Sequence, residues 1–204
     1  MLPFLSKIFE KLMCARLDSY LKSNNILCTN QFGFRKNSNT SDAINEFLDN
    51  VYSSLDSKQS TIAVYLDFSE AFDTVNHNIL MSKLLHNGAR GVLQRWFESY
   101  LTNRKQYVSI RNCNSSMSNI TLGVPQGSVS GPVLFLLYVN DMYRSSYRCV
   151  LFILLMIQVF ASDSDINNVY STVNRELVGV DNWLKANRLS LNFSKTSFQP
   201  EKCN

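Results

Sequence analysis

The stretch that decides the fold is Val64-Tyr65-Leu66-Asp67-Phe68-Ser69-Glu70-Ala71-Phe72-Asp73-Thr74-Val75-Asn76-His77. Its apolar first part belongs to a run rich in β-branched and aromatic residues, which predicts a strand over residues 61–68. Asp67 interrupts this run, and a carboxylate in a buried strand is costly unless a cation or hydrogen-bond donors hold it. The pattern favours a strand that ends on a metal ligand, although an aspartate at a strand end is also typical of a turn cap.

A second informative stretch is Leu122-Gly123-Val124-Pro125-Gln126-Gly127-Ser128-Val129-Ser130-Gly131-Pro132. Its glycines allow the backbone to approach a ligand closely, and its prolines are compatible with the start of a helix. An apolar run to Tyr138 follows and predicts that helix.

The two stretches resemble the palm motifs of reverse transcriptases, and most of all those of the non-LTR (LINE-type) retrotransposons. Asp67-Phe68-Ser69-Glu70-Ala71-Phe72-Asp73 and Gly123-Val124-Pro125-Gln126-Gly127-Ser128 carry the resemblance, which extends over nearly the whole chain. It implies an α+β right-hand polymerase fold with partial fingers and palm, an antiparallel palm sheet packed on helices, and no thumb. It also implies one domain truncated at both ends, with residues 1–60 fingers-like and residues 61–204 forming a palm with inserted fingers elements.

The activity that the resemblance implies is RNA-directed DNA synthesis, with an RNA template, a DNA primer and deoxynucleoside triphosphates as partners. Nucleotidyl transfer of this kind uses two divalent ions, Mg²⁺ or Mn²⁺, held by carboxylates. Asp67 is the expected catalytic metal ligand.

The resemblance also assigns residues to the nucleotide. Phe72 matches the aromatic ring under the sugar, although helical spacing equally fits a core phenylalanine. Gln126 and Gly127 match the loop that supports the incoming nucleotide, and Lys195 matches a lysine near its triphosphate.

Arg35 and Lys36 lie in the glycine- and asparagine-rich segment Asn30–Ser41. By itself such a segment is typical of a polar loop. In the family it resembles a fingers segment that contacts the template and primer backbone, so both cations are candidate phosphate contacts.

One family motif is missing from this sequence. Reverse transcriptases carry a hairpin reading aromatic-Ala-Asp-Asp, and an alignment on Gln158-Val159-Phe160-Ala161 places its two aspartates on Leu155 and Met156. Asp163 is a poor substitute, because it lies about 23 Å beyond Met156 along an extended strand. Two functions therefore stay open: a reverse transcriptase domain, or a catalytically dead remnant with weak nucleic-acid binding, which we expect for this copy.

The missing motif is compatible with a shifted reading frame. Ile153 to Gln158 can be encoded by the codons ATT TTG CTG ATG ATA CAA, one choice among the synonymous sets, and the same bases read from the third position would encode Phe-Ala-Asp-Asp-Thr. The hypothesis requires one small insertion or deletion upstream of Ile153 and a compensating one near Gln158.

Composition adds few constraints. The 204 residues suffice for one substantial core, and the formal net charge of +4 permits a nucleic-acid partner without requiring one. The five cysteines are scattered without a Cys-x-x-Cys pair, which argues against a disulfide framework or zinc site. We expect an intracellular protein, cytoplasmic or nuclear, because no secretory leader or membrane span is evident.

Hydrophobic spacing predicts the other elements. Helices are expected from Leu5 to Ser23, over Ile44–Leu55, from His77 to a stop at Asn87, over Val92–Tyr100 and over Ile166–Leu184. Tyr107–Ile110 is expected to form a hairpin with Ser118–Leu122, and Leu189–Thr196 to be strand-like. His77 and His86 are expected at the surface or at helix caps.

Overall fold

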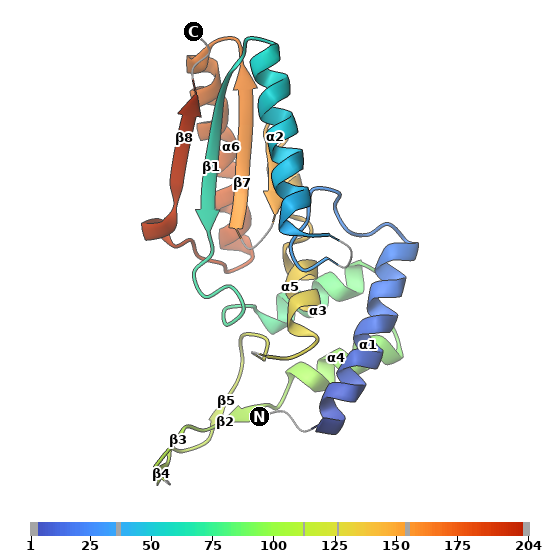
Figure 1. Cartoon of the computed structure of the whole chain (residues 1–204). Helices are drawn as coiled ribbons and strands as arrows, with labels where there is room; N and C mark the ends of the chain where they lie inside the picture. The colour runs from blue at the N-terminus through green and yellow to red at the C-terminus, as the bar shows by residue number, and fades with distance from the viewer. Residues whose placement is uncertain (1–3, 36–37, 112, 126, 154–155, 202–204) are drawn as a thin grey trace. The chain divides into compact units, whose positions relative to one another are not determined.

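The computed structural model describes residues 4–35, 38–111, 113–125, 127–153 and 156–201. The chain forms two compact units (Figure 1). The first unit comprises Met1–Ile26 and Glu70–Tyr138, and the second comprises Leu27–Ser69 and Val139–Asn204.

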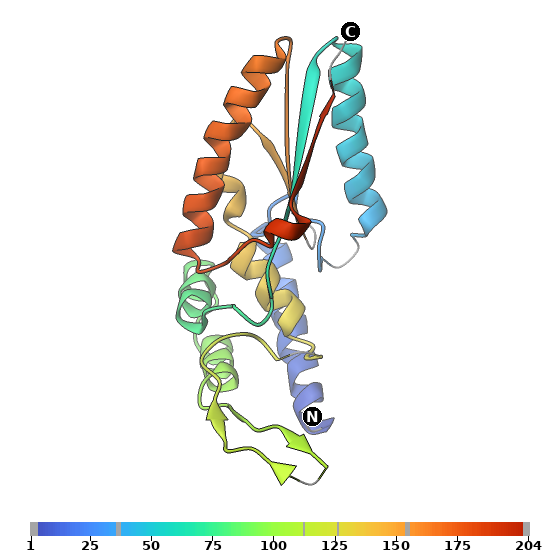
Figure 2. The ribbon, with the colours of Figure 1, turned by 90° about the vertical axis from the view of Figure 1, so that its left-hand side faces the viewer.

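The second unit is built on a four-stranded antiparallel sheet with the strand order β6-β7-β1-β8. Its strands are β1 (Ser60–Asp67), β6 (Val150–Ile153), β7 (Met156–Asp163) and β8 (Ser197–Glu201). Two long helices, α2 (Thr40–Asp56) and α6 (Ile166–Ala186), lie on opposite faces of this sheet (Figure 2). Two short 3₁₀ helices, η1 (Met142–Ser145) and η2 (Phe193–Lys195), complete the unit.

Both faces of the central strand β1 are buried, which explains its nearly continuous apolar sequence. Ala63 packs with Phe152 and Phe160 in a cluster under Phe47 of α2, whose ring meets both phenylalanines edge-on. Because side chains alternate along a strand, Ile62, Val64 and Leu66 face the other side, where α6 packs on β1 and β7.

The first unit is mainly helical. It contains α1 (Phe4–Ser23), α3 (His77–His86), α4 (Val92–Leu101) and all but the last residue of α5 (Gly131–Val139). Helix α1 buries Met13, Leu17 and Leu21 on the face that its spacing predicts, but the apolar side chains of its first part are exposed: Leu5, Ile8, Phe9 and Leu12. A long exposed hairpin follows α4, and it contains β2 (Lys105–Gln106), β3 (Ser109–Ile110), β4 (Cys113–Asn114) and β5 (Ser118–Asn119).

The α+β class, the antiparallel sheet and the predicted helices are confirmed. The predicted hairpin pairing is wrong: Ser109–Ile110 pairs with Cys113–Asn114, because the chain turns back at Arg111, where φ is +47°. Ser118–Asn119 instead pairs with Lys105–Gln106. Among the described residues, no helix is both long enough and apolar enough to cross a bilayer.

The strand predicted over Leu189–Thr196 is also largely wrong. Only Leu191 forms a bridge, to Phe68, and the chain then turns through η2. Asn192 directs this turn, because its carbonyl accepts from the Lys195 amide and its side chain accepts from the Ser194 hydroxyl. The strand β8 begins only at Ser197.

Candidate functional site

Asp67 is the last residue of β1, as the sequence predicts. Its carbonyl accepts a hydrogen bond from the Asn192 amide at 2.8 Å, and the next residues are tied to the same segment by the bond from the Ser69 amide to the Ser190 carbonyl. Hydrogen bonds on this side therefore fix the backbone that carries the carboxylate. The side chain is about one quarter exposed.

The residue opposite Asp67 on the neighbouring strand is Met156, the first residue of β7. Directly paired residues of antiparallel strands project to the same face, with Cβ atoms about 4.5–5.5 Å apart. Met156 therefore occupies the place from which a second carboxylate would meet Asp67. Leu155, the other position expected to carry an aspartate, lies outside the described residues.

These residues do not fit a magnesium or manganese site. Hard divalent cations require several oxygen ligands, and a thioether such as that of Met156 is a soft ligand. Within residues 4–35, 38–111, 113–125, 127–153 and 156–201, no three His, Cys, Asp or Glu side chains gather closely enough to hold a metal ion.

Lys195 lies beside Asp67, with its Nζ 3.8 Å from the Asp67 Oδ2. The sequence predicts Lys195 near the nucleotide triphosphate, and in this conformation its ammonium faces the carboxylate. The lysine side chain is 70% exposed, so the pair contributes little stability.

Asp163 lies at the far end of β7, opposite Ser60, whereas Asp67 is at the other end of β1. Its Oδ1 accepts from the Asp165 amide, and Asp165 in turn caps α6 through the Asn167 amide. Both aspartates thus have local turn and cap contacts.

The two family-like stretches meet in the first unit. The Val124 amide donates to the Phe72 carbonyl, and the Gly123 amide donates to the Val75 carbonyl, at 2.9 and 2.8 Å. His77 adds a side-chain bond from Nε2 to the Gly123 carbonyl at 2.7 Å. His77 is thus buried in this contact rather than lying at the surface, while His86 ends α3 and is exposed.

Gly123 is required at this junction. Its φ is +80°, and a Cβ at this position would lie 2.8 Å from the Asp73 carbonyl oxygen. Gly127 also has a positive φ, +71°, but the space around its Cα is open. The predicted nucleotide contact Gly127 is exposed, and Gln126 lies outside the described residues.

Phe72 is half-buried, and its ring packs against the buried ring of Phe135 in α5, with 5.0 Å between centroids. This contact agrees with the alternative that Phe72 is a core phenylalanine. The sugar contact stays a prediction.

Sequence reasoning missed Glu10, a fully buried residue on α1. Its Oε2 accepts from the amides of Val129 and Ser130 at 2.8 and 3.4 Å, so it holds the loop that leads into α5. The available signal was its spacing: Glu10 lies three and seven positions before Met13 and Leu17, on the apolar face of α1.

Arg35 is partly buried, and its Nη1 donates to the Cys28 carbonyl at 3.1 Å. The nearby Phe32 and Gly33 amides both donate to the Ile153 carbonyl at the end of β6. The segment before Arg35 is therefore anchored to the sheet. Lys36 lies outside the described residues, and the phosphate contacts of both cations stay predictions.

Comparisons with known proteins agree with the motifs. Residues 1–204 match the family model described as reverse transcriptase (RNA-dependent DNA polymerase). The chain is 37% identical over 145 residues to a probable RNA-directed DNA polymerase from the X-element transposon of Drosophila melanogaster, covering 70% of this chain and 16% of that protein. It is 32% identical over 145 residues to the RNA-directed DNA polymerase from the mobile element jockey of the same species, covering 70% and 15%. The chain therefore matches only a small part of these relatives.

Solved structures support the fold. A telomerase of Candida tropicalis in complex with a fragment of telomeric RNA superposes with a TM-score of 0.69 at 12% identity, covering 97% of this chain and 34% of that chain. An apo telomerase of the same species, truncated of its C-terminal domain, gives 0.66 at 14%, covering 95% and 40%. The expected right-hand polymerase fold is thereby confirmed.

Proposed function

Because the chain belongs to the reverse transcriptase family, in the group found in non-LTR retrotransposons, we propose that it is a reverse transcriptase domain whose polymerase centre is incomplete. The domain keeps the carboxylate of Asp67 and the glycine-rich loop, but it lacks the second carboxylate pair. It does not extend a primer.

The observation that carries this proposal is the pairing of Asp67 with Met156. Phosphoryl transfer depends on positioning and charge neutralisation by metal ions, for which carboxylates supply the ligands. A methionine at the paired position supplies neither charge nor a hard ligand. The positive charge beside the Asp67 carboxylate is instead the ammonium of Lys195.

Weak binding of template and primer is part of the proposal. Family membership supports it, as does the formal net charge of +4. Arg35 and Lys36 are the proposed phosphate contacts, Phe72 the proposed sugar contact, and Gln126 and Gly127 the proposed nucleotide contacts. The phosphate contacts of Arg35 and Lys36 do not involve the missing carboxylates.

Manganese binding tests the incomplete centre without any need for catalysis. Electron paramagnetic resonance of free Mn²⁺ should reveal no specific site in the purified chain. The double variant Leu155→Asp/Met156→Asp should gain one, and adding Asp67→Ala should remove it again. A specific site in the unaltered chain that Asp67→Ala abolishes would contradict the proposal.

A polymerase that is active as it stands is the second candidate, favoured by the retained carboxylate of Asp67 at the end of the central strand. It would require carboxylates from outside the described residues or from another chain. The manganese titration separates the two candidates.

A further inference from the structure

A short pattern is repeated in η1 and in the loop that follows it before β6, Tyr143-Arg144-Ser145-Ser146-Tyr147-Arg148. Each Tyr-Arg pair is exposed, whereas Ser146 and Cys149 are buried and Ser145 is half-buried. The two pairs form what we call the tyrosine–arginine surface: Tyr143, Arg144, Tyr147 and Arg148. It lies within the second unit and includes none of the residues that carry the polymerase motifs.

Tyr147 is the centre of this surface. The residue is 91% exposed, which is the largest exposure among the exposed large hydrophobic residues in the described part of the chain. Its ring lies between Arg144 and Arg148 in the sequence, both of which are exposed, so the ring and the two cations are open to the same ligand.

The loop that presents Tyr147 is held in place by the carboxylate of Glu176 on α6. The Glu176 Oε2 accepts from the Ser146 hydroxyl at 3.0 Å and from the amides of Tyr147 and Arg148 at 2.8 and 3.4 Å. These bonds fix the backbone of the two residues whose side chains are exposed. A surface held in one conformation loses less entropy when it binds.

Gly179 on α6 contributes a second restraint. It lies three residues after Glu176, on the same face of the helix. A Cβ at this position would lie 2.2 Å from the Ser145 carbonyl oxygen, so only glycine permits this close approach of the loop to the helix. Glu176 and Gly179 of α6 thus both hold this loop close to the helix, while the side chains of Tyr147 and Arg148 stay exposed.

The other pair, Tyr143 and Arg144, is held by contacts between its own two side chains. The Arg144 guanidinium lies over the Tyr143 ring, 5.5 Å from its centroid, and the Arg144 Nε donates to the Tyr143 hydroxyl at 3.1 Å. The nearby acids are Asp141, which accepts from the Trp183 indole, and Glu176, which is mostly buried. Exposed positive charge therefore prevails over negative charge at this surface.

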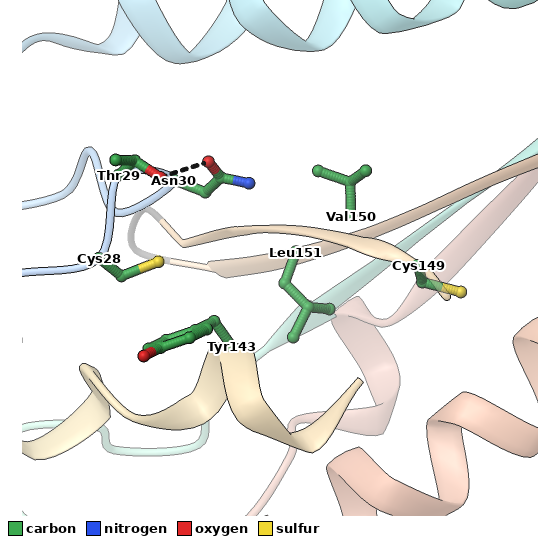
Figure 3. A pocket seen from close by; sticks show the side chains of 7 residues that line it. All are labelled: Cys28, Thr29, Asn30, Tyr143, Cys149, Val150 and Leu151. Carbon is green, nitrogen blue, oxygen red and sulfur yellow. Dashed lines mark hydrogen bonds between the residues drawn. The ribbon is translucent and has the colours of Figure 1, made fainter. Parts of the chain in front are cut away.

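A pocket of about 400 Å³ borders the surface, and Tyr143 forms one of its walls (Figure 3). Leu151 lines it on the side of Tyr143, whereas the Val150 side chain points to the opposite side of β6, and Thr29 and Asn30 contribute a hydroxyl and an amide. A flat ring with polar edges, such as a nucleobase, matches this mixture of side chains.

We propose that the tyrosine–arginine surface binds single-stranded nucleic acid. Tyr147 stacks on a base, and Arg144 and Arg148 contact phosphates. Exposed aromatic rings beside cations are the combination that proteins use for single strands without strong sequence preference. The binding does not depend on the polymerase centre, so it goes beyond the proposed function.

The test is equilibrium binding of a short labelled oligouridine to the purified chain, by fluorescence anisotropy. EDTA is present and nucleoside triphosphates are absent, so polymerase chemistry cannot contribute. Tyr147→Ala should weaken binding at least about fivefold, because base stacking on an aromatic side chain is lost. Arg144→Ala/Arg148→Ala should reduce the slope of log affinity against log salt by about 1.4, which corresponds to two phosphate contacts on a single strand.

The matched control is Tyr52→Ala/Lys185→Ala, which removes an exposed tyrosine and an exposed cation from α2 and α6 of the same unit. This double variant should change the affinity for the oligouridine much less than the summed effects of Tyr147→Ala and Arg144→Ala/Arg148→Ala. Circular dichroism should show that all variants stay folded.

Three results would overturn the proposal: no binding by the unaltered chain at low salt, unchanged affinity and salt slope in the Tyr147 and arginine variants, or equal affinity for polyglutamate. The last result would mean that the surface recognises acidic polypeptides rather than nucleic acid.

Discussion

Asp67 shows how one neighbour changes what a side chain does. Its carboxylate lies opposite Met156 on the paired strand and beside the ammonium of Lys195, with which it forms a weak surface ion pair. A carboxylate opposite it would instead place two negative charges side by side, which favours either a bound cation or a proton shared by the two groups. The residue at position 156 therefore decides whether the strand end attracts a metal.

Gly123 and Gly127 allow a residue-level prediction about the glycine-rich loop. Either glycine replaced by alanine pays about 1–2 kcal/mol for the left-handed backbone. Gly123→Ala should lose about 1–3 kcal/mol more, because its Cβ would meet the Asp73 carbonyl oxygen at 2.8 Å and force the junction apart.

Urea unfolding of both variants measures the difference. Gly127→Ala is the matched control, since it has a similar φ and no atom within 4 Å of the added Cβ. Equal losses of stability in the two variants would mean that the close approach at Gly123 costs nothing to disturb.

Helix α6 allows a prediction at the level of the element. A glycine inside a helix usually lowers stability by about 1 kcal/mol relative to alanine. Gly179→Ala should nevertheless destabilise the protein by about 1–3 kcal/mol, because the new Cβ would lie 2.2 Å from the Ser145 carbonyl oxygen.

The control on the same helix is Asn174→Ala, an exposed substitution that also raises helix propensity. Thermal unfolding should show opposite signs, a fall in Tm for Gly179→Ala and no change or a small rise for Asn174→Ala. A rise in both would argue against the fixed loop beside α6.

Glu176 makes the stability of this loop depend on pH. Burial alone would raise the pKa of this carboxyl, but the hydrogen bonds from Tyr147, Ser146 and Arg148 lower the pKa below its ordinary value of 4.5. The ionised form is therefore favoured by folding. Its contribution is complete above pH 4.5 and is lost as the pH falls through the lower pKa of the folded protein.

The measurement is the free energy of unfolding of the unaltered chain and of Glu176→Gln over a range of acidic pH. The unaltered chain should be the more stable one at neutral pH, and the gap should shrink as the carboxyl becomes protonated. A gap that stays constant through the acidic range would exclude this role for Glu176.

Some elements were predictable from the sequence because local signals agree with the fold. The strand before Asp67 has β-branched and aromatic residues, and α6 has apolar residues at helical spacing. The segment Leu189–Thr196 misled because its alternating pattern resembles a strand, whereas Asn192 and Ser194 stabilise a turn through side-chain contacts. The hairpin pairing depends on where the chain turns back, and no local preference identifies Arg111 as that point.

At the scale of the whole molecule, long-range pairings were out of reach of sequence patterns. Periodicity does not give the register that places Met156 opposite Asp67, because it joins residues far apart in the chain, and only the family resemblance pointed to Leu155 and Met156. The contact of Glu10 with Val129 and Ser130 is equally distant in sequence, and a charged residue in an amphipathic helix usually faces solvent.

The gene sequence tests the shifted-frame hypothesis for Leu155 and Met156. We predict that a shifted frame over the codons of Ile153 to Gln158 encodes Ala-Asp-Asp, with a small insertion or deletion on each side. Sequencing of the genomic locus and its transcript decides this. If no shifted frame there encodes Ala-Asp-Asp, the shifted-frame hypothesis is wrong.

Primer extension by the purified chain tests the incomplete polymerase centre most directly. The assay uses an annealed RNA template and DNA primer, deoxynucleoside triphosphates, and Mg²⁺ or Mn²⁺, with an active reverse transcriptase of the same family as positive control. We predict no extension above background, because Met156 stands where a second carboxylate would meet Asp67. Extension by the unaltered chain that Asp67→Ala abolishes would contradict this prediction and would require ligands other than those found beside Asp67.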